Sequence, residues 1–333
     1  MIENEPSRAQ TKIALQFAAG IAVGAFFLWF TFRGVDISEV SKIFSAISRE
    51  WIFIAVITYF AALFLRIIRW WLILRQATNL RIHQVATALL TGYAVNALLP
   101  ARLGELFRAD FCRRQYGASR TVVLGTIMVE RFTDGIIVLC ALALGVAAVK
   151  TDSASLSLLQ FLLASGVVIF GALGAALALL GSRRVARFVS GLLERYPFLA
   201  ARFGALSESM RLVKSRRMVG ILLASLLIWL AEGAAQWCIL HACGVSLDLF
   251  GMCLVIGAVS LSTLLPSPPG FLGTMQFAFV LSVTILGYSS PQGLAAALAN
   301  QIFLLGSMVA VGLALLLVTY TQRFKASVRA NRR

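Results

Sequence analysis

The sequence predicts an all-α polytopic membrane protein with six full spans plus two oppositely oriented re-entrant hairpins. Of the 333 residues, 59% are hydrophobic, and the mean hydropathy of +0.87 lies well above that of soluble domains. Several apolar windows reach the roughly 20 residues that a helix needs to cross about 30 Å of hydrocarbon. Two further apolar stretches are interrupted by proline and glycine, which stop helices. We expect residues 1–333 to form a single integral membrane domain.

Six segments have the length and hydropathy of full spans. They are 13–32, 51–74, 121–149, 157–181, 218–243 and 293–319. Arginine and lysine cluster between spans two and three, in the 182–217 loop with nine basic residues, and in the 320–333 tail. Because lysine and arginine favour cytoplasmic loops, these regions and the N-terminal residues 1–12 are predicted to be cytoplasmic. The protein would then lie in the cytoplasmic (inner) membrane, and its net charge of +16 indicates topology rather than nucleic-acid binding.

The stretches 82–118 and 249–290 remain, and under this topology each must enter and leave on the same side. The first hairpin would enter from the cytoplasm and the second from outside. Each contains a Leu-Leu-Pro sequence followed by glycine four residues after the proline, at a constant offset of 166 positions. This match favours an inverted repeat, which in transporters places the binding site at paired broken helices. The expected break residues are Pro100, Gly104, Pro266, Pro268, Pro269, Gly270 and Gly273.

Three charged residues lie deep inside the third predicted span. At 1.5 Å per residue, Glu130 sits roughly 14 Å and Asp134 roughly 20 Å from the start of the span. Charge at this depth is costly, so such residues are functional candidates. Glu130 and Asp134 share a helix face, and Arg131 can partly neutralise Asp134. The cluster either handles substrate or protons, or it is a buried ion-pair cluster that holds helices together.

Charged residues in two other spans leave alternatives open. Glu232 is predicted to pair with Arg131 or with an arginine drawn inward from the cytoplasmic side, or to be a buried protonated acid. Arg66 and Arg69 lie near the inner end of the second span. We expect them to anchor that helix at the membrane surface, because long basic side chains reach toward headgroups. Headgroup binding is the alternative for both arginines.

Two arginines and a glutamate follow the first break directly. Arg102 and Arg108 are suited to phosphate, because a guanidinium can bind phosphate through two parallel hydrogen bonds. Glu105 would hold these arginines in place. Anchoring at the inner membrane surface is the alternative for this group.

The sequence contains no recognisable catalytic signature. Two histidines, His83 and His241, lie far apart, and five cysteines show no Cys-x-x-Cys spacing. We therefore expect no metal site and no cofactor, and an enzyme is the less favoured class.

Two motifs resemble a known family. Asn96-x-x-x-Pro100-x-Arg102-x-Gly104-Glu105-x-x-Arg108, followed by Glu130-Arg131-x-x-Asp134, resembles the flippase-like family, also called the lysylphosphatidylglycerol synthase transmembrane region. The stretch from Pro266 to Gly273 is similar to its second signature. Thr274, Met275 and Gln276 stand where that signature often carries an acidic residue. The resemblance covers about 13–320, and we expect this chain to lack the aminoacyl-transferring domain that follows the membrane part in the two-domain members.

The resemblance implies a domain that moves, or helps to make, modified phospholipids or polyprenyl-linked intermediates. The favoured function is translocation of a phospholipid or polyprenyl-phosphate-linked lipid across the cytoplasmic membrane. The alternative is a membrane enzyme, or enzyme subunit, that modifies lipid headgroups or lipid-linked sugars. The expected partners are lipids with anionic or phosphate headgroups, with a homo-oligomer and a lipid-modifying enzyme as further candidates. The residues expected to bind the substrate are Asn96, Arg102, Glu105, Arg108, Glu130, Arg131, Asp134 and Glu232.

Overall fold

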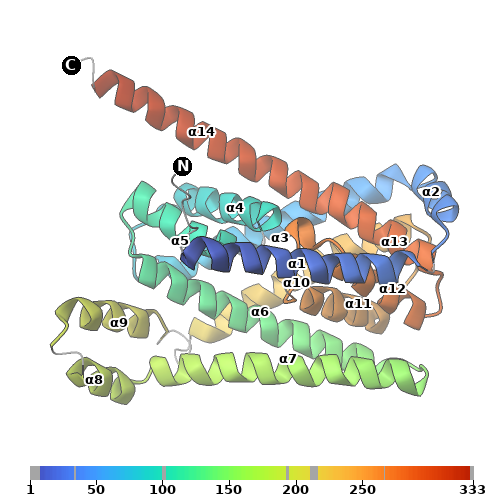
Figure 1. Cartoon of the computed structure of the whole chain (residues 1–333), viewed down its shortest axis with the longest axis horizontal. Coiled ribbons are helices and arrows are strands. Elements are labelled where there is room, and N and C mark those ends of the chain that lie inside the picture. The colour runs from blue at the N-terminus through green and yellow to red at the C-terminus, as the bar shows by residue number, and fades with distance from the viewer. Residues whose placement is uncertain are drawn as a thin grey trace, which may run out of the picture.

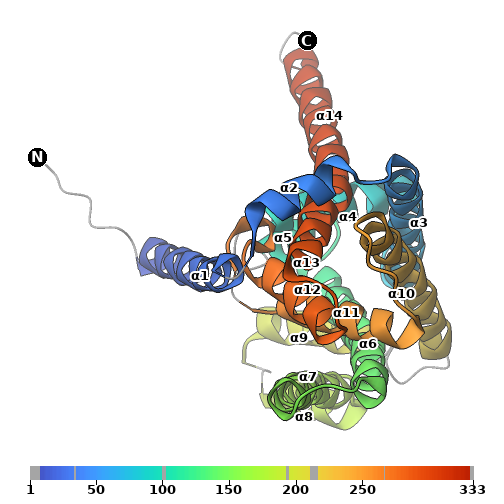
Figure 2. The same cartoon turned by 90° about the vertical axis from the view of Figure 1, so that its right-hand side faces the viewer.

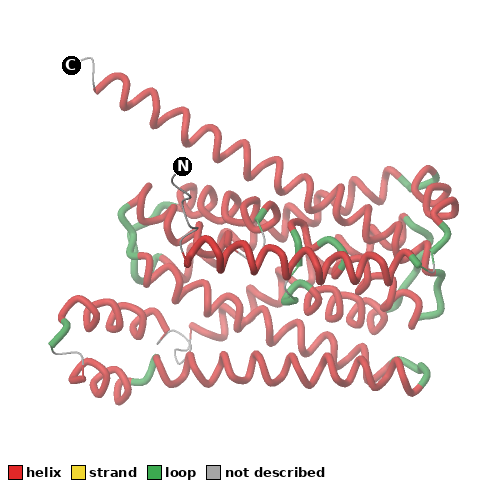
Figure 3. Tube along the Cα trace, in the orientation of Figure 1, coloured by secondary structure: helices red, strands yellow, loops and turns green. Residues whose placement is uncertain are grey.

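The computed structural model describes residues 8–33, 35–99, 103–192, 195–210, 217–265 and 267–330. All regular structure in these ranges is helical (Figure 3). Most helices run along the long axis of the molecule and pack side by side (Figures 1 and 2). Pro100, Arg102 and Pro266 lie outside the described residues.

The chain forms fourteen α-helices and two short helical turns within the described ranges. In chain order they are α1 (Arg8–Phe32), α2 (Ile37–Ser45), α3 (Arg49–Leu74), α4 (Ile82–Leu98), α5 (Leu103–Tyr116), α6 (Arg120–Ala148), α7 (Ser153–Leu180), α8 (Arg183–Leu192), α9 (Pro197–Met210), α10 (Arg217–Ala242), α11 (Leu249–Ser262), η2 (Pro269–Phe271), α12 (Thr274–Ile285), α13 (Ser290–Ala299), η3 (Asn300–Leu305) and α14 (Gly306–Ala330).

Five helices of the described chain are long and apolar enough to cross a membrane. They are Arg49–Leu74, Arg120–Ala148, Ser153–Leu180, Arg217–Ala242 and Ser290–Gln322. A sixth is gained if Gly20–Phe32 and Ile37–Ser45, bent by 87°, form one span. The long apolar helices confirm an all-α polytopic membrane protein, while the count of six full spans stays a prediction.

Side-chain caps fix the start of several helices near one end of the molecule, at the right in Figure 1. The Asp36 carboxylate accepts a hydrogen bond from the Ser38 backbone N–H at the start of α2. Asp152 and Asp248 cap α7 and α11 in the same manner. Hydrogen bonds from Ser155 lower the pKa of Asp152, which keeps this cap ionised. Short acidic caps at this end contrast with the arginine-rich connections at the other.

The two predicted hairpins are present as pairs of helices separated by a break. α4 and α5 pack against each other in one half of the molecule, and α11 and α12 do so in the other half (Figure 1). The two pairs enter from opposite ends, and residues at both tips line the same cavity. That these pairs are re-entrant in a membrane, and that they belong to an inverted repeat, stays a prediction.

Each hairpin lies against a long helix of the other half. A Cβ atom added at Gly257 of α11 would lie 2.6 Å from Leu142 Cβ of α6. Likewise, a Cβ atom at Gly312 of α14 would lie 2.5 Å from the carbonyl oxygen of Leu90 in α4. Membrane helices use small residues at such close approaches, because lipid supplies no hydrophobic force to press helices together. These contacts fix the hairpin tips near the middle of the bundle.

Candidate functional site: a charged cavity between the hairpin tips

A cavity of about 220 Å³ lies where the two hairpin tips meet. Its wall is drawn from α3, α4, α6, α7, α10, the second hairpin and the helix that begins with η3. The polar and aromatic residues that line it are Tyr59, Arg66, Tyr93, Asn96, Arg131, Asp134, Phe170, Trp229, Glu232, Gln236, Ser260, Thr263, Phe271 and Asn300. Such a polar cavity between otherwise apolar helices has the character of a ligand site.

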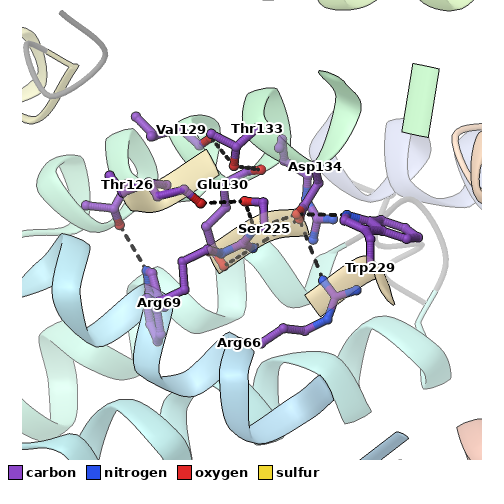
Figure 4. Close-up of polar contacts among 12 residues, drawn as sticks. Arg66, Arg69, Thr126, Val129, Glu130, Thr133, Asp134, Ser225 and Trp229 are labelled. Atoms are coloured by element: carbon purple, nitrogen blue, oxygen red, sulfur yellow. Dashed lines mark hydrogen bonds and ion pairs between the residues drawn. The ribbon is translucent and has the colours of Figure 1, made fainter. Parts of the chain in front are cut away.

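Arg69 of α3 is the centre of the ion-pair network beside this cavity (Figure 4). Its side chain is only 1% exposed and binds both carboxylate oxygens of Asp134, at 2.5 and 3.1 Å. It also donates to Glu130 at 3.2 Å and to the Ser225 hydroxyl at 2.6 Å. A planar guanidinium can satisfy several acceptors at once, which a lysine ammonium cannot do with the same geometry. Arg69 therefore ties α3, α6 and α10 together.

Arg66, one turn before Arg69, faces the cavity itself. Its guanidinium forms an ion pair with Glu232 of α10 and lies 3.6 Å from an oxygen of Asp134. It also stacks over the Trp229 ring, with 5.4 Å between the guanidinium carbon and the ring centroid. The Trp229 N–H donates to Asp134 at 3.1 Å, as Figure 4 shows. Glu232 has a side chain 19% exposed and pairs with a single arginine, whereas Asp134 is held on several sides.

Arg108 of the first hairpin is buried behind the cavity rather than in its wall. Its guanidinium forms an ion pair with Glu130. It also lies over the Trp70 ring, 4.0 Å from the centroid, and the Trp70 N–H donates to Thr126 at 3.1 Å. With a side chain 2% exposed, Arg108 anchors α5 against α3 and α6.

Arg131 is the most accessible arginine of the group. Its Nε donates to a carboxylate oxygen of Glu105 at 2.7 Å, and the two side chains are 29% and 25% exposed. Next to them, the Asn96 amide oxygen accepts a hydrogen bond at 2.9 Å from the Gly104 backbone N–H at the start of α5. The side chains of Asn96 and Arg131 thus connect the first break to the cavity wall.

The second hairpin is joined to its neighbour through neutral amides instead of charges. Gln276 of α12 donates to Gln301, and Gln301 donates at 2.6 Å to the carbonyl oxygen of Gly270 in the break. Gln301 belongs to the π-helical turn η3, and such turns are frequent at functional sites. Phe271, in the cavity wall, has a φ of 57°, a conformation that costs a bulky residue about 1–3 kcal/mol.

The break itself requires glycine at two positions and proline at two others. Gly270 and Gly273 have φ values of 72° and 90°, which glycine adopts without strain. Pro269 begins the short turn η2, while Pro268 lies against Gly24 of α1. In the first break, Gly104 lies so close to α4 that an added Cβ would come within 2.2 Å of the Gly92 carbonyl oxygen.

The structure brings seven of the eight proposed binding residues into one connected region. Four of them line the cavity directly: Asn96, Arg131, Asp134 and Glu232. Glu105, Arg108 and Glu130 lie next to it as ion-pair partners. Whether these residues bind a substrate stays a prediction.

The expectation that Arg66 and Arg69 anchor the second span at the membrane surface is wrong. Their side chains are 9% and 1% exposed and point into the bundle toward carboxylates. Glu232 accordingly pairs with Arg66, not with Arg131. The signal available in the sequence was depth: Arg66 lies eight residues before the end of α3, or about 12 Å at 1.5 Å per residue.

Metal binding has no support in the described part of the chain. No group of three or more histidine, cysteine, aspartate or glutamate side chains there lies close enough to hold an ion. The carboxylates near the cavity are instead occupied by arginines. Four arginines (66, 69, 108 and 131) face four carboxylates (105, 130, 134 and 232) in this region.

These features define a multi-pass membrane protein with broken helices around a charged internal cavity. The sequence profile of the lysylphosphatidylglycerol synthase TM region matches residues 17–312. The chain therefore belongs to this family of membrane domains, whose name relates it to the modification of a lipid. No curated protein was found to match the chain. No solved structure was found to match it either.

Proposed function

We propose that this protein is a flippase-like translocator, which moves a phospholipid or a polyprenyl-phosphate-linked lipid across the cytoplasmic membrane. The observation that carries this proposal is the cavity at the meeting point of two hairpins that enter from opposite ends. A headgroup bound there would lie between the two halves, and small movements of either hairpin would open the cavity to one side. Discontinuous helices at the midplane serve this purpose in many transporters.

The arginines divide into two groups by their surroundings. Arg69 and Arg108 are buried and pair with carboxylates of α6, Arg69 with Glu130 and Asp134 and Arg108 with Glu130, so they form a fixed frame. Arg66 and Arg131 line the cavity. A headgroup phosphate would replace a carboxylate on one of these two, since phosphate accepts two parallel hydrogen bonds from a guanidinium. The acyl or prenyl chains would remain in lipid while the headgroup passes.

Charge balance constrains this exchange. Because the network pairs its arginines with an equal number of carboxylates, a bound phosphate adds negative charge that the site must compensate. A carboxylate freed from its arginine can compensate by taking up a proton. Glu105 and Glu232 are the carboxylates placed for this role, as each is held by one arginine and remains partly exposed.

The proposed orientation places both termini in the cytoplasm. The start of α1, the end of α14 and the α8–α9 segment all lie at one end of the molecule (Figure 1). Exposed Arg183, Arg184 and Arg187 of α8 belong to this end. Basic residues there would meet anionic lipid headgroups of the inner leaflet. A second copy of this chain and a lipid-modifying enzyme remain candidate partners.

The enzyme alternative assigns acid–base chemistry to Glu130 and Asp134. Glu130 is 3% exposed, is held by Arg69 and Arg108, and is absent from the cavity wall as described. Asp134 does line the cavity, but Arg69 binds both of its oxygens. These contacts favour a structural frame over a pair of catalytic carboxylates, and translocation is the better-supported function.

The test is lipid movement in proteoliposomes that contain purified protein and a lipid labelled on its acyl chain. We expect Arg131→Gln to reduce transport at least tenfold, because it removes a phosphate-binding guanidinium. The double variant Glu105→Gln/Arg131→Gln recreates the neutral amide pair of the second hairpin, so it should retain wild-type thermal stability and still fail to transport. Arg113→Gln, an exposed change at the end of α5, serves as the control. Full transport by the double variant would contradict the proposal.

A further inference from the structure

Gln236 is a buried amide in the cavity wall with an unsatisfied oxygen. It is 6% exposed, and its Oε1 atom has no hydrogen-bond partner among the described residues. A buried polar atom without a partner costs about 1–3 kcal/mol, so native proteins rarely retain one without a reason. Because Gln236 lines the cavity, a ligand in the cavity is the partner that its position indicates.

The chemistry of the amide limits what this partner can be. A glutamine side chain carries an acceptor and two donors, and rotation by 180° exchanges their places. Whichever of the two amide atoms, oxygen or nitrogen, occupies the unsatisfied position therefore needs a hydrogen-bond partner. A hydroxyl group satisfies both orientations because it donates and accepts, whereas a phosphate only accepts and an ammonium only donates.

Gln236 lies close along α10 to the charged residues of the cavity. Gln236 follows Glu232 by one turn of α10, which is about 6 Å along the helix axis, and Glu232 is the partner of Arg66. Asn300, 7% exposed, lies in the same cavity wall and presents a second neutral amide. Its one described side-chain hydrogen bond is a weak contact from Nδ2 to the Met275 sulfur at 3.6 Å. A phosphate at Arg66 would thus share its cavity with two neutral amides.

We propose that Gln236 and Asn300 form a hydroxyl-binding subsite for the part of the headgroup beyond the phosphate. The substrate would then be a lipid phosphodiester with a glycerol-type or sugar-type headgroup, on either an acyl or a prenyl chain. This inference rests on the proposed translocation and adds its headgroup selectivity. Arg66 and Arg131 recognise the phosphate, and Gln236 and Asn300 recognise what the phosphate carries.

The experiment compares two labelled lipids of the same single negative charge in proteoliposomes. Phosphatidylglycerol carries headgroup hydroxyls, and phosphatidylethanol has none. The wild-type protein should move phosphatidylglycerol about tenfold faster, the ratio expected from roughly 1.4 kcal/mol of hydrogen bonding. Gln236→Leu should lower the phosphatidylglycerol rate to that of phosphatidylethanol and leave the latter unchanged. Gln160→Leu, at an exposed glutamine of α7, should change neither rate.

Further measurements distinguish acyl-chain from prenyl-chain lipids, and hydroxyl recognition from a role of Gln236 in packing. A labelled prenyl-phosphate hexose that moves in a Gln236-dependent manner would support the subsite and assign it to prenyl lipids. Equal wild-type rates for phosphatidylglycerol and phosphatidylethanol would contradict the hydroxyl-binding subsite and leave the proposed translocation intact. Faster movement of phosphatidylethanolamine than of phosphatidylglycerol would also contradict the subsite without contradicting translocation. Equal loss of both lipids in Gln236→Leu and in Gln236→Asn would assign Gln236 to packing. No movement of any lipid by the wild-type protein would instead overturn the proposed function.

Discussion

At the scale of single residues, the stability of the site depends on buried arginines and carboxylates that share partners. Arg69 holds Asp134 and Glu130 at once, and Arg108 completes the pairing of Glu130. Removing one member of a buried ion pair leaves a charge without compensation, which is far more costly than the pair itself is favourable. The network is therefore sensitive to the loss of a single partner and tolerant of balanced changes.

Arg69→Met should lower the free energy of unfolding by about 3–5 kcal/mol, because Asp134 and Glu130 would lose their shared donor. The double variant Arg69→Met/Asp134→Asn should recover part of this loss, because Glu130 keeps its pair with Arg108 and Arg66 keeps its pair with Glu232. Thermal denaturation in detergent measures both effects, with Arg113→Gln as the exposed control. An Arg69→Met protein as stable as the wild type would show that the network carries no stability.

At the scale of helices, the two halves use equivalent contacts with different chemistry. Glu105 is the third residue of α5 and binds Arg131, while Gln276 is the third residue of α12 and binds Gln301. Arg131 and Gln301 are 170 positions apart, and Glu105 and Gln276 are 171 apart. Arg66 and Glu232, separated by 166 positions, lie opposite each other on α3 and α10. These matches support the proposed inverted repeat, with a charged pair in one half and a neutral pair in the other.

The packing of α1 on the second break gives a prediction at this scale. Gly273→Ala should destabilise the protein by more than about 1 kcal/mol, because φ is 90° there. In addition, the new Cβ would come within 2.2 Å of the Gly24 carbonyl oxygen of α1. Gly171→Ala on α7, where an added Cβ meets nothing within 4 Å, should leave the melting temperature unchanged or raise it slightly. Equal melting temperatures for the two variants would contradict this packing.

At the scale of the whole molecule, the arrangement predicts which segments share a side of the membrane. Thr151, before α7, and Arg187, in α8, lie at opposite ends of the long α7 helix. With both termini cytoplasmic, Thr151→Cys in a cysteine-free background should react with a membrane-impermeant maleimide in intact cells. Arg187→Cys should react only in inverted membrane vesicles. The opposite labelling pattern would reverse the proposed orientation.

The sequence was sufficient for the features that depend on pattern along the chain. Proline and glycine marked both breaks, and the depth of Glu130, Arg131 and Asp134 marked the charged region. The partners of Arg66 and Arg69 were not accessible in this way, because hydropathy does not tell whether a helix face points to lipid or to another helix. The contact of α1 with the second break and the π-helical turn at Asn300–Leu305 likewise depend on tertiary packing.

If this protein redistributes a lipid rather than making one, a leaflet-resolved lipidome of cells with and without the gene will show it most directly. Translocation predicts at least one phosphate-bearing lipid whose total amount is unchanged while its share in the outer leaflet changes when the protein is absent. Restoring the wild-type gene should restore that share, and the Glu105→Gln/Arg131→Gln gene should not. A lipid species that disappears altogether, with no change in the sidedness of the others, would contradict the claim and indicate synthesis.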